Sequence, residues 1–122
     1  METVTFTLDG REVSVSSGPY LRDGEPTPEA REFAESLIGQ LDDMRAVAAA
    51  EYLDTYNETW RPAGQPTLDE VAFCARLVRP SIVLFDEVGA AAVYFGDSGM
   101  FAGHWIEVSV REGAVGHAVM LG

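Results

Sequence analysis

The chain has 122 residues, 47% of them hydrophobic and 23% charged, which is typical of a soluble globular protein, and we expect a single domain over residues 1–122. No apolar run approaches the roughly 20 residues that a membrane-spanning helix needs, and the N-terminus lacks the basic start and apolar block of a secretory signal. The formal net charge is −12 and all eight basic residues are scattered arginines, which argues against binding to nucleic-acid phosphates. A single cysteine, Cys74, excludes an intrachain disulfide and favours a cytoplasmic location.

A β-hairpin is predicted at the N-terminus. Apolar residues alternate with polar ones on both sides of Asp9-Gly10, a pair that strongly favours a two-residue turn. In that register Phe6 faces Val13 and Val4 faces Val15. Residues 17–26 show no periodicity and are expected to form a loop.

A long helix is predicted from Thr27 to about Asn57. Thr27 can cap its first turn, Pro28 fits the first helical position, and apolar residues recur at spacings of three and four. Gly39 is the expected place for a kink or break, because glycine is a poor helix former.

A second, shorter helix is predicted just before residue 80. Thr67 and Glu70 match a capping box, in which the Thr67 side chain accepts the backbone amide of Glu70 and the Glu70 side chain accepts the backbone amide of Thr67. Its predicted apolar face consists of Val71, Cys74, Ala75 and Val78, and Pro80 is expected to end it. Cys74 is interpreted as a buried small hydrophobe rather than a reactive thiol.

Four strands forming an antiparallel meander are predicted in the C-terminal third, at Ile82–Glu87, Ala91–Phe95, His104–Arg111 and Ala114–Leu121. A two-residue loop at Glu112-Gly113 would pair Val110 with Val115 and Val108 with His117. The face toward the core would then carry Ile106, Val108, Val110, Val115, Val119 and Leu121. The wetter face would carry Trp105, Glu107, Ser109, Gly116, Ala118 and Met120. The predicted class is therefore α+β, with the helices packed on one face of the sheet.

The residues around His104 form the candidate binding site. His104 opens a strand, where an imidazole can face a cleft, and Asp97 or Asp86 could orient it. The alternative is that His104 bonds a backbone group of the preceding loop. Tyr94, Phe101 and Trp105 complete the candidate set, and an exposed Trp105 would indicate a partner surface.

Other chemistry finds little support in the sequence. In the predicted register His104 and His117 lie about 13 Å apart, too far for one metal ion, and no metal or cofactor is expected. Ser98 lies near His104 but in an ordinary turn composition, and no Gly-x-Ser-x-Gly elbow is present. The sequence therefore favours a role other than catalysis.

One pair of motifs resembles a known type of protein. Tyr56-Asn57-Glu58-x-Trp60 is followed by Tyr94-Phe95-x-Asp97 and then by Phe101-x-Gly103-His104-x-Ile106-x-Val108. This pattern, over about residues 53–122, resembles small bacterial proteins classed as domains of unknown function. Some of these are suspected to be immunity or accessory proteins encoded near polymorphic toxins, so the resemblance implies a protein-binding role.

Three functions follow from these observations. The first is an acidic, immunity-like or accessory module that binds another protein of basic character, because 13 of the 20 carboxylates lie in the first sixty residues. The second is a small-ligand binder or hydrolase-type enzyme with a pocket at His104. The third is a homo-oligomer, such as a homodimer, that associates through the sheet. Neither nucleic acid nor a membrane is an expected partner.

Overall fold

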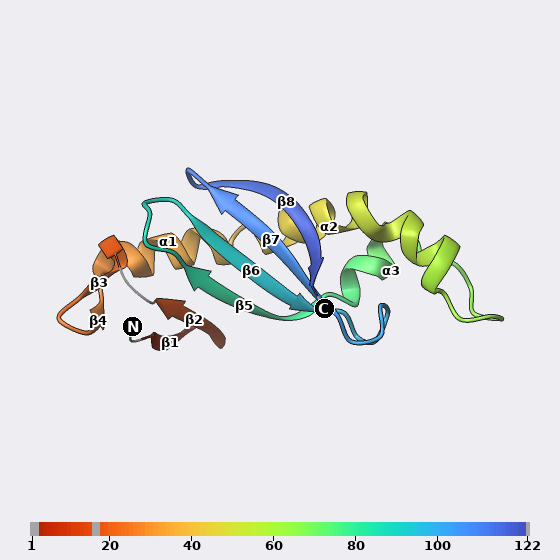
Figure 1. Ribbon diagram of the computed structural model, residues 1–122, viewed down its shortest axis with the longest axis horizontal. Helices are drawn as coiled ribbons and strands as arrows, with labels where there is room; N and C mark the ends of the chain where they lie inside the picture. Colours follow the sequence, from red (N-terminus) through yellow and green to blue (C-terminus); the bar gives the residue numbers. More distant parts are fainter. Residues whose placement is uncertain (1–2, 16–17, 122) are drawn as a thin grey trace.

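The computed structural model describes residues 3–15 and 18–121, which form an α+β fold around one six-stranded sheet (Figure 1). The strands, in their spatial order, are β1 (Val4–Leu8), β2 (Arg11–Val15), β5 (Val78–Leu84), β6 (Ala91–Gly96), β7 (Trp105–Arg111) and β8 (Ala114–Leu121). The helices are α1 (Pro28–Ile38), α2 (Leu41–Thr55), the π-helix η2 (Tyr56–Trp60) and α3 (Glu70–Ala75). A 3-10 turn, η1 (Gly18–Tyr20), and the two-residue strands β3 (Leu21–Arg22) and β4 (Glu25–Pro26) precede α1.

The N-terminal hairpin has the predicted register, with Phe6 opposite Val13 and Val4 opposite Val15. Its turn residues both have positive φ, 50° at Asp9 and 74° at Gly10, as a tight hairpin turn requires. The strand β2 then pairs in parallel with β5, while all other pairs of the large sheet are antiparallel. A parallel pair needs a long crossover, and the helices between β2 and β5 provide it.

The long helix begins and breaks as predicted. Thr27 Oγ1 accepts the amide of Ala30 at 3.1 Å, and Pro28 occupies the first helical position. The helix breaks at Gly39 and Gln40, so α1 and α2 are separate helices. Their apolar sides cover the sheet, with α1 on β1 and β5 and α2 on β7 and β8.

The predicted cap and apolar face of the second helix are wrong. The cap is Asp69, whose carboxylate accepts the amide of Ala72 at 2.8 Å, so Thr67 lies outside the helix. Val71 is 79% exposed, whereas Phe73 is fully buried. A helix of six residues has too few turns for periodicity to select a face, and the large aromatic side chain takes the core position. Cys74 is half-buried, and burial raises the pKa of its thiol.

Pro80 lies inside strand β5 instead of ending a helix. The β5–β6 register shifts between Val78 and Ser81, and the pairing of β5 with β2 begins only at Ser81. Pro80 therefore has no ladder partner that needs its missing N–H, which is the usual condition for proline in a strand. Arg79, with φ of 51°, makes the bend.

The β7–β8 hairpin corrects the predicted faces. Val110 pairs with Val115 as predicted, but Val108 pairs with Ala118 rather than with His117, because a β-bulge intervenes. One extra residue reverses the faces of everything beyond it. Ala118 is therefore buried and Met120 half-buried, while Val119 and Leu121 are 45% and 37% exposed. Ile106, Val108 and Val110 face the core as predicted.

Gly116 and Ser109 build this bulge. Ser109 Oγ accepts the amide of His117 at 3.1 Å, across the hairpin. A side-chain Cβ at Gly116 would lie 2.9 Å from Ser109 Oγ, so only glycine leaves room for the bond.

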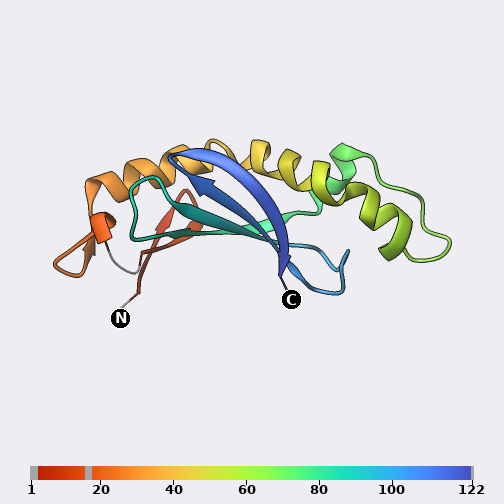
Figure 2. The ribbon, with the colours of Figure 1, turned by 45° about the horizontal axis from the view of Figure 1, so that its top comes forward.

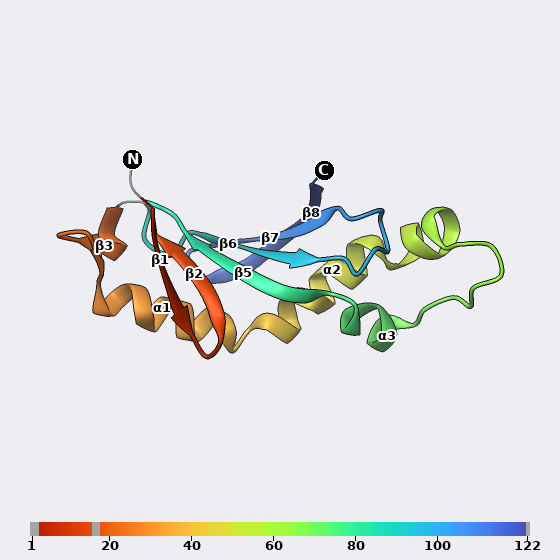
Figure 3. The same ribbon diagram turned by 90° about the horizontal axis from the view of Figure 1, so that it is seen from below.

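The molecule has two layers, with the row of helices above the sheet in Figure 2. Seen from below in Figure 3, α3 lies beside α2 and the hairpin β1–β2 lies at one edge of the sheet. Within residues 3–15 and 18–121, no helix covers the second face of the sheet, which we call the outer face, and none is long and apolar enough to cross a membrane.

Candidate functional site

Asp97 is a structural residue that shapes the loop between β6 and β7. Its side chain is 3% exposed. Its Oδ1 accepts the amide of Gly99 at 2.8 Å, and its Oδ2 accepts those of Phe101 at 2.9 Å and Gly103 at 3.2 Å. Charge-assisted bonds of this kind hold a loop that has few backbone pairs of its own. Asp97 thus orients the loop, and Asp86 lies at the opposite end of β6 in the β5–β6 loop.

Phe101 is the centre of an aromatic cluster. Its ring lies 5.6–6.2 Å, centroid to centroid, from four other rings in edge-to-face arrangements. These rings belong to Tyr52, Tyr56, Trp60 and Phe73. Phe101 is fully buried, so it stabilises the junction of α2, η2, α3 and the loop and cannot contact a ligand from solvent.

His104 bonds the loop before it, the alternative considered for it in the sequence. Its Nδ1 lies against the carbonyl oxygen of Phe101, and its ring contacts Trp60 at 5.9 Å between centroids. A carbonyl oxygen only accepts, so Nδ1 is the donor in this contact. Ser98 is also engaged, since its hydroxyl donates to the carbonyl of Arg76 at 2.7 Å.

The Tyr56–Trp60 motif ends α2 as a π-helix and fastens the next loop. The side chain of Asn57 donates to the carbonyl of Leu68 and accepts its amide, both at 2.9 Å. Arg61 donates to the carbonyls of Asn57 and Gln65. Most of the residues that carry the resemblance, among them Asn57, Asp97 and Phe101, therefore build the structure at this end of the molecule.

Tyr94 and Trp105 lie elsewhere, on the outer face of the sheet. Together with Ser81 and Leu121 they line a shallow hollow of about 320 Å³. Trp105 is 45% exposed. Burial and then the facing Glu107 carboxylate raise the pKa of Tyr94 to about 12. The five predicted site residues thus fall into two groups, Asp97, Phe101 and His104 in the loop and Tyr94 and Trp105 on the sheet.

A larger cavity, which we call the acidic cavity, lies at the other end of the molecule and was not predicted. Its volume is about 560 Å³. Three carboxylates and several apolar side chains line it, and four separate segments contribute. The aromatic, acidic and aliphatic side chains that line it are Tyr20 from η1, Glu29, Glu32 and Phe33 from α1, Val88 from the β5–β6 loop and Glu112 from the β7–β8 turn.

Sequence signals for this cavity are weak. Glu29 and Glu32 have an ordinary explanation at the start of a helix, where the dipole favours carboxylates. Glu112 is a turn residue with φ of 53°, and nothing in its local sequence connects it with α1. Only the packing of α1 across the sheet brings these segments together.

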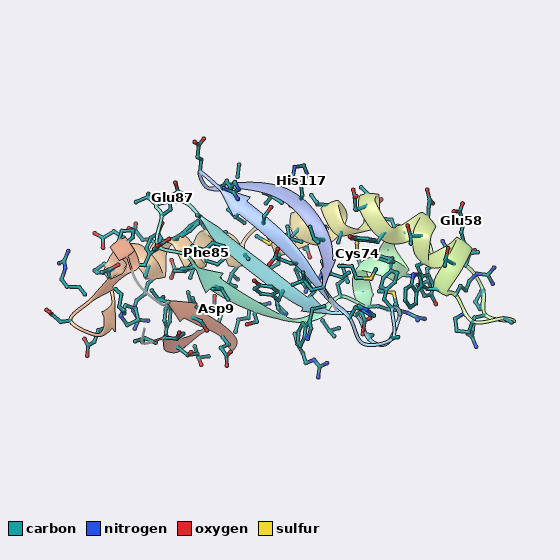
Figure 4. All side chains as sticks on the ribbon, viewed as in Figure 1. Asp9, Glu58, Cys74, Phe85, Glu87 and His117 are labelled. Atoms are coloured by element: carbon teal, nitrogen blue, oxygen red, sulfur yellow. The ribbon has the colours of Figure 1, made fainter. Side chains whose placement is uncertain are left out.

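The helical layer, residues 28–60, is strongly acidic. From Pro28 to Trp60 the chain has eight carboxylates against two guanidinium groups, hence a formal charge of −6, and all eight are exposed. Figure 4 shows one of them, Glu58, projecting outward from η2. Both arginines contact other residues of the chain: the exposed Arg31 lies 4.8 Å from the Phe6 ring centroid, and Arg45 donates to the Leu77 carbonyl at 3.1 Å.

The described part of the chain contains no set of side chains that could bind a metal ion. Within residues 3–15 and 18–121, no three His, Cys, Asp or Glu side chains gather closely enough to hold an ion.

Comparison with models of known protein families assigns the chain to one family. It matches, over residues 5–118, the DUF2262 family, described as an uncharacterized protein conserved in bacteria. The chain belongs to this family. The match confirms the resemblance to a bacterial family of unknown function, while the motif itself stays a prediction. Neither a curated protein nor a solved structure matches the chain.

Proposed function

We propose that this DUF2262 protein is a protein-interaction module that binds a basic partner through its helical layer. The observation that carries the proposal is the set of eight exposed carboxylates on α1, α2 and η2. In the described residues the one ion pair is Asp42–Arg45, at 3.1 Å. The remaining carboxylates are therefore available to a cationic surface, which they would attract over a range set by ionic strength.

The resemblance to immunity and accessory proteins supplies a setting for this proposal. A basic toxin is the kind of partner that an acidic layer would recognise, because complementary charge raises association rates and discriminates among partners. Protein binding also agrees with a histidine and a serine that are already engaged by backbone carbonyls.

Affinity capture from a lysate of the source bacterium tests the proposal, using a charge-neutralised helical layer. The helical-layer variant carries Glu35→Gln, Asp43→Asn, Glu51→Gln and Glu58→Gln. The matched control loses the same number of exposed carboxylates elsewhere, through Asp9→Asn, Glu12→Gln, Asp23→Asn and Glu25→Gln. We expect a basic partner that the wild type and the control retain at low salt, and that high salt or the helical-layer variant releases.

Two results would contradict the proposal. One is a partner retained equally by the helical-layer variant, and the other is a partner whose capture does not depend on salt. Any captured partner would also be purified and titrated with the wild type, the helical-layer variant and the control. This measurement excludes partners that are captured indirectly.

Self-association is a second candidate, favoured by the outer face. Trp105, Val119 and Leu121 are all at least 37% exposed there. Charges of both signs flank them: Glu107 faces Val119, and a guanidinium nitrogen of Arg79 lies over Gly96, the pairing partner of Trp105. An apolar patch with both charges at its edge can complement a second copy of itself.

Sedimentation velocity separates this candidate from the first. A dimer would fall to a monomer in Trp105→Ser, with the helical-layer variant unaffected. A monomer at all accessible concentrations would eliminate it.

A further inference from the structure

We infer that the acidic cavity is a binding site for an arginine side chain of the partner protein. The inference rests on the proposed function in that the arginine belongs to a protein, and it adds the side chain and the place where that chain is held. The cavity lies where the start of α1, which carries carboxylates of the helical layer, meets η1 and two loops of the sheet.

The floor of the cavity suits a planar cation. The rings of Tyr20 and Phe33 stack with centroids 5.4 Å apart and an interplanar angle of 28°. Tyr20 is only 4% exposed, so the half-buried Phe33 presents most of the aromatic surface. The Tyr20 hydroxyl accepts the amide of Gly89 at 2.8 Å, which fixes the ring. A guanidinium group is planar and weakly hydrated, so it packs on an aromatic face and gains a cation–π attraction.

The rim supplies the opposite charge. Glu29 and Glu32 are three residues apart on α1 and so lie on one face of that helix, while Glu112 approaches from the β7–β8 turn. None of the cavity's lining residues is basic. A guanidinium group has five N–H donors in a fixed fork, enough to bond carboxylates on two sides at once.

The walls of the cavity are held together by backbone contacts. Gly113 donates its amide to the carbonyl of Gly89 at 3.0 Å, and a Cβ at Gly89 would lie 2.9 Å from the Cα of Glu112. The β5–β6 loop and the β7–β8 turn are thus joined by direct backbone contact. A preformed site spares the ligand the cost of ordering loops.

The same features disfavour other cations. Among the described residues, the three carboxylates are not gathered closely enough to hold one metal ion. A lysine ammonium is a compact, strongly hydrated charge that gains little from a stacked aromatic floor. An uncharged aliphatic chain would leave the carboxylates without a partner.

A titration of the full-length protein followed by NMR tests the cavity alone. The probe is N-acetyl-L-arginine methylamide, compared with the norleucine and lysine derivatives and with putrescine. We expect saturable shifts at the amides of Gly89 and Gly113 with a dissociation constant on the order of 1 mM, and weaker binding of the other three. The double variant Glu29→Gln/Glu32→Gln should weaken binding about fivefold, because each exposed charge pair contributes a modest amount.

Matched variants separate the site from bulk charge. Glu35→Gln removes one carboxylate from the same helix outside the cavity and should leave binding of the probe unchanged. Glu112→Asn removes a rim carboxylate while keeping a residue that tolerates positive φ, so a weaker interaction in this variant cannot be attributed to loss of the turn.

The inference is overturned if the norleucine derivative or putrescine binds as tightly as the arginine derivative, or if Glu35→Gln has as large an effect as the double variant. Failure of the two proposals is distinguishable. If the helical-layer variant keeps its partner while the probe still binds the cavity, the proposed function fails and the cavity remains a guanidinium site. If capture depends on the helical layer but the probe does not bind, only the arginine assignment fails.

Discussion

At one end of the sheet Phe101 is enclosed by four aromatic rings, whereas at the other end Tyr20 and Phe33 stack beneath the acidic cavity. The enclosed end carries the recognisable motif, and its Asp97, Phe101 and His104 bond or pack against their own chain. The cavity end carries no motif, and its residues come from four segments. A motif in this protein thus identifies what holds the fold together, and the open site has to be found from the structure.

Phe101→Ala is expected to give the largest effect. It removes a fully buried ring from the centre of the aromatic cluster, and the enclosing rings can collapse only in part. We expect the free energy of unfolding to fall by about 3–5 kcal/mol, measured by chemical denaturation. A loss below 1 kcal/mol would mean that this end is not the structural one.

Asp97→Asn should come next, with a loss of about 2–3 kcal/mol. The asparagine side chain has one oxygen for the three backbone amides that the carboxylate accepts, and its NH2 group would face a donor. Ser98→Ala is the control, because it removes a single exposed bond in the same loop. Equal losses from the two changes would argue against a special role for Asp97.

Glu112→Asn should act in the opposite direction at the cavity end. Asparagine adopts φ near 53° more readily than glutamate, so the free energy of unfolding should rise by about 0.5 kcal/mol. Thermal unfolding monitored by circular dichroism measures the change. A clear destabilisation would show that the Glu112 carboxylate serves the fold, which would remove the contrast between the two ends.

Glu107→Gln, on the outer face between the two ends, should have the smallest effect. The pKa of Tyr94 is raised to about 12, from about 10 in the unfolded chain, so the folded state favours the neutral phenol. The resulting stability is fully present below pH 10 and is lost as the pH rises from about 10 to 12. The variant should lower this pKa, as followed by ultraviolet absorbance, and should leave stability at pH 7 nearly unchanged. A Tyr94 pKa that does not respond would show that burial alone causes the shift.

Local sequence patterns correctly predicted those turns, caps and helix breaks that depend on residues close together in the sequence. The Asp9-Gly10 turn, the Thr27 cap, the break at Gly39 and the order of the meander strands were all confirmed, and each depends on residues within a few positions of one another. The register beyond Ser109 was wrong because the bulge depends on a contact between Ser109 and Gly116 across the hairpin. The apolar face of α3 was wrong because Phe73 packs on Phe101, 28 residues later in the chain.

Composition and periodicity by themselves determined that this chain forms an α+β fold with an acidic helical layer, since burial of apolar faces and exposure of charge follow from spacing along single elements. Only the tertiary structure decided that β2 lies beside β5 and that Glu112 lies beside α1. Both depend on the crossover that carries the helices over the sheet, and such long-range packing leaves no local periodicity in the sequence.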